Sequence, residues 1–234
     1  MNRIEKDSYE IISKKCAELM IEQIKTKPDC SFCLATGRSP LYAYRMFVQM
    51  AKEEALDVSK VVFIKLDEWS GLEMDDPATC EFFLQREIFR PLEIQPLQII
   101  SFNSASNNLE NECVRIQNEL DKTGCIDMSI LGIGRNGHLG LNEPSDWLHA
   151  YAHVANLADK TKEHAMLKET NRAVQSGLTL GMADLMRSLY VVMMVTGKEK
   201  EEACSEMLYG GITTKNPATF LQLAHHVTIL IEQD

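Results

Sequence analysis

The chain has 234 residues, of which 45% are hydrophobic and 25% are charged, as is typical of a folded globular protein. The formal net charge of −10 argues against a general nucleic-acid-binding protein, which is usually basic. No stretch approaches the roughly 18 apolar residues of a membrane span, and Met1–Asp7 has no apolar run like that of a secretion signal. Because the seven cysteines fit free thiols in a reducing compartment, we expect a cytoplasmic location without nucleic-acid or membrane partners.

The first half of the chain alternates predicted helices with short apolar strands. The capping-box pattern Asp7–Glu10 predicts a helix that runs to Pro28, with Asp7 as its cap. The apolar runs 31–35 and 61–66 predict two buried strands, separated by a helix over 40–54. Further helices are predicted near 79–89 and over 109–122.

The second half continues the alternation. Strands are predicted over 127–131, 178–180, 190–195 and 227–231, with a helix over 198–208. The irregular stretch 145–155 is interpreted as a lid or as a strand-bearing excursion. Apolar strands between amphipathic helices predict a largely parallel sheet that is covered on both faces. We therefore predict a single α/β domain over residues 1–234, with three αβα layers and a Rossmann-like, doubly wound, mostly parallel sheet.

The loop after the first predicted strand is a candidate phosphate site, because ligands of such sheets bind at the carboxyl ends of the strands. Ser39 is predicted to cap the next helix, with Pro40 at its first position. Gly37 allows a sharp turn close to a ligand, and Arg38 adds a positive charge. The unpaired N–H groups of a helix start suit a phosphate. A well-capped turn without a ligand explains the same pattern, so both interpretations stay open.

Two adjacent carboxylates, Asp67 and Glu68, follow the second predicted strand. Neighbouring side chains of an extended segment point to opposite sides, so one carboxylate can face the cleft while the other holds structure. Trp69 comes next and is placed to exclude water, which would raise the pKa of a carboxyl group. A solvated acidic turn is the plainer interpretation of the same residues.

The glycine-rich stretch 132–144 after the third of these strands carries the richest signal. Four glycines occur within nine residues, His138 lies among them, and Glu143 follows five residues later. A lone histidine is more often structural, but one in a glycine-rich loop at the sheet edge is a candidate proton carrier. The Gly-x-Gly-x-x-Gly spacing also resembles a dinucleotide fingerprint, although Pro144 interrupts the helix that should follow.

In this order, the stretches 36–40, 66–69 and 132–144 resemble the hexosamine-6-phosphate deaminase/isomerase family. The runs Lys65–Trp69 and Asn136–Pro144 are most similar to its galactosamine-6-phosphate isomerase (deaminase) branch. The related 6-phosphogluconolactonases share the glycine–histidine core but typically lack the Asn-Glu-Pro ending. The resemblance covers about residues 30–200.

The resemblance implies roles for individual residues. Asp67 matches the base that enolises the sugar, His138 the acid/base that opens the ring, and Glu143 the carboxylate that orients this histidine. The glucosamine-type enzymes have an aspartate where this chain has Asn136, which can orient an imidazole but supplies no negative charge. The residues that match the phosphate site are Thr36, Gly37, Arg38, Ser39 and Lys200. The candidates for the family's arginine phosphate ligand are Lys168 and Arg172.

The activity implied by the resemblance is isomerisation of a 2-amino-2-deoxyhexose 6-phosphate with release of ammonia. The implied substrate is galactosamine 6-phosphate, giving tagatose 6-phosphate, or the glucosamine compound, giving fructose 6-phosphate. No cofactor and no metal are expected, and the expected partner is this small-molecule substrate. A 6-phosphogluconolactonase and a non-catalytic sugar-phosphate sensor are the alternatives. The oligomeric state stays open, a homo-oligomer included.

Overall fold

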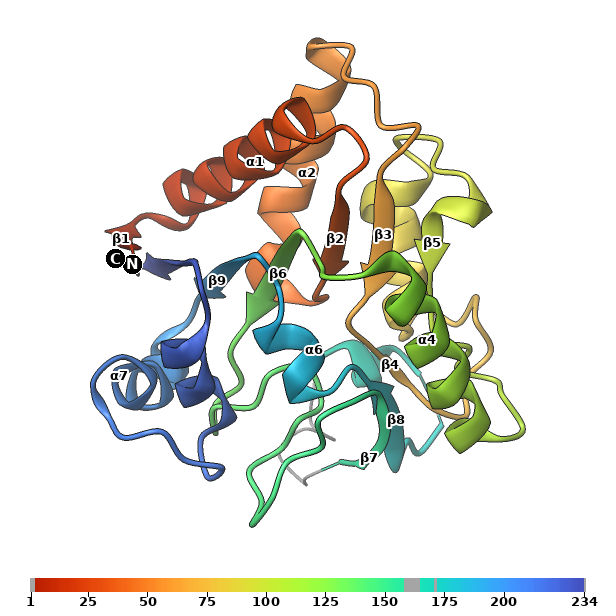
Figure 1. Ribbon diagram of the computed structural model, residues 1–234, viewed down its shortest axis with the longest axis vertical. Coiled ribbons are helices and arrows are strands. Elements are labelled where there is room, and N and C mark those ends of the chain that lie inside the picture. The colour runs from red at the N-terminus through yellow and green to blue at the C-terminus, as the bar shows by residue number, and fades with distance from the viewer. Residues whose placement is uncertain (1–2, 158–164, 171, 234) are drawn as a thin grey trace.

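The computed structural model of the protein describes residues 3–157, 165–170 and 172–233 (Figure 1). Its central sheet has seven strands in the order β1-β10-β9-β6-β2-β3-β5, and every neighbouring pair is parallel. The strands are β1 Arg3–Asp7, β2 Ser31–Leu34, β3 Val62–Lys65, β5 Ile99–Ile100, β6 Met128–Gly132, β9 Tyr190–Val195 and β10 Val227–Glu232. The predicted doubly wound, mostly parallel sheet is confirmed.

The strand order reverses between β2 and β6. From β2 the chain builds outward through β3 and β5, and from β6 it builds in the other direction through β9 and β10. In doubly wound sheets, ligands bind in the crevice at such a switch point, beyond the carboxyl ends of the strands. The fold therefore brings the loops after β2 and β6 to opposite sides of one crevice.

Helices cover both faces of the central sheet and complete the three predicted layers (Figure 1). Alternate residues of a strand face two separate apolar cores: Phe32 belongs to the core that contains Tyr44, and its neighbour Cys33 belongs to the core that contains Ile116. Among the described residues, none of the helices is both long and apolar enough to cross a membrane. The helices are α1 Tyr9–Thr26, α2 Arg38–Glu53, α3 Cys80–Leu84, α4 Leu109–Thr123, α6 Met182–Met186 and α7 Glu201–Tyr209. The shorter or irregular turns are η1 Gln85–Phe89, η2 Pro96–Gln98, η3 Ala165–Glu169, η4 Lys198–Lys200 and η5 Pro217–Leu223.

A smaller antiparallel sheet lies beyond the carboxyl edge of the central one, in the order β4-β8-β7 (Figure 1). Its strands are β4 Asp67–Trp69, β7 His153–Asn156 and β8 Ser176–Thr179. Only Leu66 separates β3 from β4, so the chain passes from one sheet to the other within a single residue. The strand-bearing interpretation of 145–155 therefore holds for its last residues, and the strand predicted over 178–180 belongs to this smaller sheet.

Two helix starts differ from the sequence prediction. Asp7 ends β1 and is not the cap of α1; Ser8 is the cap, and its side chain accepts the N–H of Ile11. Helix α2 begins at Arg38 with Gly37 as its cap, not at Pro40 with Ser39 as the cap. Gly37 has a φ of 97°, a left-handed conformation that glycine adopts without strain.

Candidate active site

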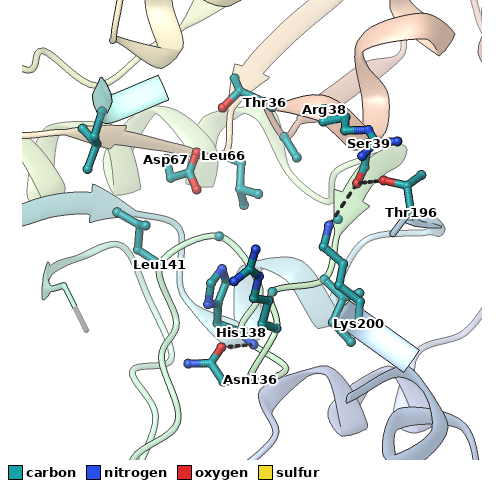
Figure 2. A pocket seen from close by; sticks show the side chains of 18 of the residues that line it. Thr36, Arg38, Ser39, Leu66, Asp67, Asn136, His138, Leu141, Thr196 and Lys200 are labelled. Atoms are coloured by element: carbon teal, nitrogen blue, oxygen red, sulfur yellow. Dashed lines mark hydrogen bonds between the residues drawn. The ribbon is translucent and has the colours of Figure 1, made fainter. Parts of the chain in front are cut away.

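A cavity of about 560 Å³ opens at the switch point, walled by the loops that follow β2, β3, β6 and β9 (Figure 2). Eight of the nine site residues expected from the sequence line this cavity. They are Thr36, Gly37, Arg38, Ser39, Asp67, Asn136, His138 and Lys200. The ninth, Glu143, is not among the lining residues but lies next to His138. Four loops that are distant in sequence thus meet around one space.

Asp67 opens strand β4 and lines the cavity. Burial and the adjacent Glu68 carboxylate raise the pKa of Asp67 to about 7, while a hydrogen bond from the Cys80 thiol and the charges of His138 and Lys65 act in the opposite direction. A carboxyl group with a pKa near neutrality is matched to taking up and returning a proton near pH 7.

Glu68 points away from Asp67 into the protein, as the alternation of an extended segment requires. It is fully buried, and its carboxylate lies 2.7 Å from the Lys65 ammonium group, which is also fully buried. Trp69 lines the cavity beside Asp67. The two adjacent acids therefore have different environments, one at the cavity and one in a buried ion pair.

His138 lies in the loop after β6, where its ring packs against Gly134. A methyl group on Gly134 would come within 2.3 Å of the imidazole, so only glycine leaves room for the ring in this position. The ring Nδ1 lies 3.4 Å from a Glu143 carboxylate oxygen, longer than the usual N–H···O distance of about 2.7–3.2 Å. The imidazole is therefore next to its carboxylate without being tightly bonded to it.

Asn136 supports this loop in a way that the sequence did not predict. Its side-chain N–H₂ donates to Glu143 Oε2 at 2.8 Å, and its oxygen accepts the backbone N–H of His138 at 3.3 Å. The sequence suggested that Asn136 orients the imidazole. Its hydrogen bonds instead orient the carboxylate of Glu143 and the backbone of the loop. Asn136 thus ties together Glu143 and the backbone of His138, the two residues whose side chains lie 3.4 Å apart.

The other end of the cavity is suited to an anion. The hydroxyl of Ser39 lies 2.7 Å from that of Thr196 and accepts a hydrogen bond from the Lys200 ammonium group at 3.2 Å (Figure 2). Burial, together with the nearby charges of Arg38 and Arg135, lowers the pKa of Lys200. The start of α2 adds backbone N–H groups that have no partner within the helix. A positive end thus forms within a chain of strongly negative net charge.

Two residues at this end escaped the sequence reasoning. Thr196 directly follows β9, and Arg135 lies in the glycine-rich loop after β6. Both could have been found from the rule that ligands of such sheets bind beyond the carboxyl ends of the strands.

Of the two candidates for an arginine phosphate ligand, Lys168 lines the cavity. Arg172 instead donates to the backbone oxygen of Gly71 and is absent from the described wall. Within the described ranges, no cluster of three or more His, Cys, Asp or Glu side chains is arranged to hold a metal ion.

The doubly wound sheet gathers a carboxyl group with a raised pKa, an imidazole and a positively charged end in one cavity. This arrangement is typical of an enzyme that acts on a small anionic substrate. Residues 5–230 match the glucosamine-6-phosphate isomerases/6-phosphogluconolactonase family, and the chain belongs to this family. The family resemblance found in the sequence is confirmed.

Several known proteins are similar over nearly the whole chain. Glucosamine-6-phosphate deaminase of Thermoanaerobacter sp. (strain X514) is 38% identical over 229 residues, covering 97% of this chain and 90% of the relative. AgaI of Escherichia coli (strain K12), provisionally named a deaminase, is 40% identical over 225 residues, covering 96% and 89%. The solved structure of a monomeric glucosamine-6-phosphate deaminase matches with a TM-score of 0.94 at 32% identity, covering 99% of this chain and 97% of that one.

Proposed function

We propose that the protein isomerises and deaminates a 2-amino-2-deoxyhexose 6-phosphate, yielding a ketose 6-phosphate and ammonia. The observation that carries this proposal is the shared cavity: Asp67 and His138 face the same space as the positive end around Lys200 (Figure 2). The similarity to proteins named glucosamine-6-phosphate deaminases over nearly the full chain supports it independently.

The positive end anchors the substrate by its phosphate group. The hydroxyls of Ser39 and Thr196 donate to phosphate oxygens, and the Lys200 ammonium group supplies charge. Because the phosphate is attached to C6, this anchor leaves C1 and C2 at the far end of the sugar, toward Asp67 and His138. Positioning of this kind places the reacting atoms beside the catalytic groups and removes part of the entropic barrier.

The chemistry then requires only proton transfers and one water molecule. His138 moves a proton from the C1 hydroxyl to the ring oxygen, which opens the ring. Asp67 takes the proton from C2 to form an enolamine and returns a proton to C1. Water adds to the resulting C2 iminium group, and ammonia leaves. Each general acid–base step typically contributes about 10²–10⁴-fold to the rate.

We further propose galactosamine 6-phosphate as the preferred substrate, with tagatose 6-phosphate as the product. The support is the similarity of Lys65–Trp69 and Asn136–Pro144 to the galactosamine-6-phosphate branch. The glucosamine epimer, which would give fructose 6-phosphate, is the alternative substrate of the same cavity.

A coupled ammonia assay on both epimers tests the proposal. We expect ammonia release from both, with the higher kcat/KM for the galacto compound and almost none from an Asp67→Asn variant. A higher kcat/KM for the gluco compound would reverse the choice of epimer but leave the reaction in place. Acid release from 6-phosphogluconolactone without ammonia release would identify a lactonase. Binding of the sugar phosphates without turnover would identify a sensor.

A further inference from the structure

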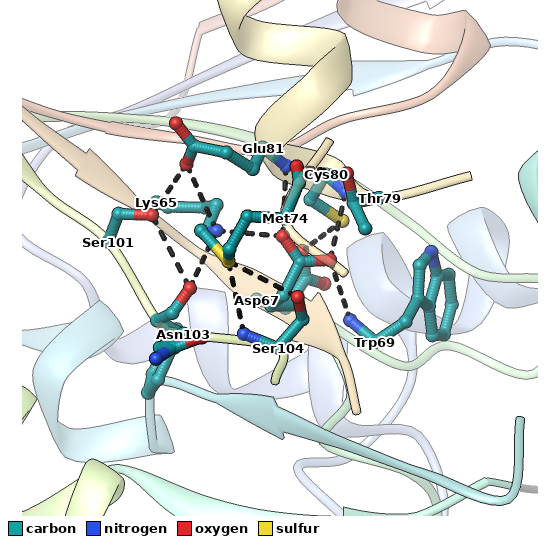
Figure 3. Close-up of polar contacts among 12 residues, drawn as sticks. Lys65, Asp67, Trp69, Met74, Thr79, Cys80, Glu81, Ser101, Asn103 and Ser104 are labelled. Atoms are coloured by element: carbon teal, nitrogen blue, oxygen red, sulfur yellow. Dashed lines mark hydrogen bonds and ion pairs between the residues drawn. The ribbon is translucent and has the colours of Figure 1, made fainter. Parts of the chain in front are cut away.

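The carboxylate of Asp67 accepts a hydrogen bond from the thiol of Cys80. Among the described residues it accepts one side-chain hydrogen bond, from Cys80 Sγ to its Oδ1 at 3.6 Å (Figure 3). Cys80 is the first residue of α3 and is 2% exposed. Its sulfur in turn accepts a hydrogen bond from the hydroxyl of Thr36 at 3.2 Å. Because Thr36 donates to the sulfur, the single thiol hydrogen is available to Asp67.

The position of Cys80 is fixed by the buried carboxylate of Glu68. One oxygen of Glu68 accepts the backbone N–H groups of Trp69 and Cys80, at 2.8 and 2.9 Å. The other accepts the backbone N–H of Glu81 at 2.9 Å and the Lys65 ammonium group at 2.7 Å. With four donors on one buried carboxylate, the start of α3 is tied to β4. Because Asp67 and Trp69 belong to the same strand, β4, these bonds hold the Cys80 sulfur at a set distance from Asp67.

We propose that Cys80 is a positioning residue for the base, its thiol directing the Asp67 carboxylate into the cavity while stabilising its negative charge only weakly. This inference rests on the proposed function, in which Asp67 takes the C2 proton. A thiol is a weak hydrogen-bond donor. It orients the carboxylate but leaves it more basic than a hydroxyl donor would, which agrees with the raised pKa of Asp67.

Other ionisable groups also surround Asp67, and a test has to leave them unchanged. The titratable groups nearby are Lys65, Glu68 and His138, and the buried Cys33 and Tyr44 also interact with this carboxylate. Substitution of Cys80 changes none of these neighbouring side chains. A change in the pKa of Asp67 would therefore report on the thiol donor.

The experiment compares Cys80→Ala and Cys80→Ser with a control, Cys113→Ala, which removes a buried thiol on α4 in the other core. The readout is kcat/KM for ammonia release as a function of pH. Because Asp67 acts as a base when deprotonated, activity falls as the pH drops through its pKa. Loss of the donor in Cys80→Ala raises this pKa, so we expect the acidic limb to move up by about half a pH unit or more. The stronger donor in Cys80→Ser is expected to move it down, and Cys113→Ala to leave it in place.

A second measurement keeps this inference separate from the proposed function. The carboxyl groups are labelled with ¹³C-aspartate, and Asp67→Asn identifies the Asp67 resonance, which is then titrated in the parent and in the Cys80 variants. An upward shift in Cys80→Ala and a downward shift in Cys80→Ser support the thiol donor even if ammonia is never released. Unchanged titration in both variants, with a loss of thermal stability like that of Cys113→Ala, would show that Cys80 only fills space.

Discussion

Asp67 and His138 face one cavity, but the protein holds them by different means. Asp67 is flanked by a buried network in which Glu68 accepts four hydrogen bonds and the Cys80 thiol contacts the Asp67 carboxylate directly. His138 is carried by a glycine-rich loop, and its ring nitrogen lies 3.4 Å from Glu143. In the proposed reaction, the base is thus held in place before the substrate binds, while the imidazole has room to move closer to the carboxylate of Glu143.

The largest effect is expected on the rigid side, from Asp67→Asn. The amide keeps the shape of the side chain but accepts no proton, so we expect kcat to fall by about 10²–10⁴-fold while KM stays near that of the parent. Steady-state ammonia release gives both constants. A kcat within twofold of the parent value would remove Asp67 from the role of base.

An intermediate effect is expected on the loop side, from Gly134→Ala. The added methyl group would come within 2.3 Å of the His138 ring and push it from its place. Misplacement of a catalytic group by about 1 Å costs on the order of 10²-fold in rate, so we expect kcat on the cyclic sugar to fall by about 10–100-fold. Gly211→Ala is the matched control, because a methyl group there meets no atom within 4 Å. Equal activity of the two variants would contradict the loop-side assignment.

The smallest effect is expected at the positive end of the cavity, away from the two proposed proton carriers. Lys200→Ala removes one charged donor to the phosphate group. We expect KM to rise by about 10-fold with kcat much less affected, since a charge-assisted hydrogen bond is worth about 1.5–3 kcal/mol. Lys198→Ala, on the same turn but outside the cavity wall, serves as the control. An unchanged KM in Lys200→Ala would exclude this lysine from the phosphate site.

Much of the site could be predicted because it follows a topological rule. Thr36, Asp67 and His138 each follow a run of apolar residues that reads as a buried strand, and parallel strands present their carboxyl ends at one edge. Thr196 obeys the same rule, but a single threonine after a strand has no pattern that marks it as a ligand. Position in the chain was sufficient only where the residues themselves were chemically distinctive.

The missing pieces of the fold depend on distant partners. β1 has alternating charges and no apolar pattern, and it exists because its backbone pairs with β10 at the other end of the sequence. β4 has three residues and looks like a turn until it pairs with β8. At the start of α2, Ser39 has the better capping propensity, yet Gly37 is the cap. Tertiary context overrides local preference at each of these places.

The single-residue crossing at Leu66 has a consequence for how much change this segment tolerates. A deletion or insertion there would shift β4 by one place against β8, where Asp67 now pairs with Thr179. The two acids would then exchange sides, since strand side chains alternate. After an insertion, the aspartate would take the place of Glu68 and be one methylene too short for the donors there. After a deletion, the longer glutamate would take the place of Asp67 at the cavity. Because Asp67 and Glu68 differ in length, only the present register of β4 against β8 suits both side chains.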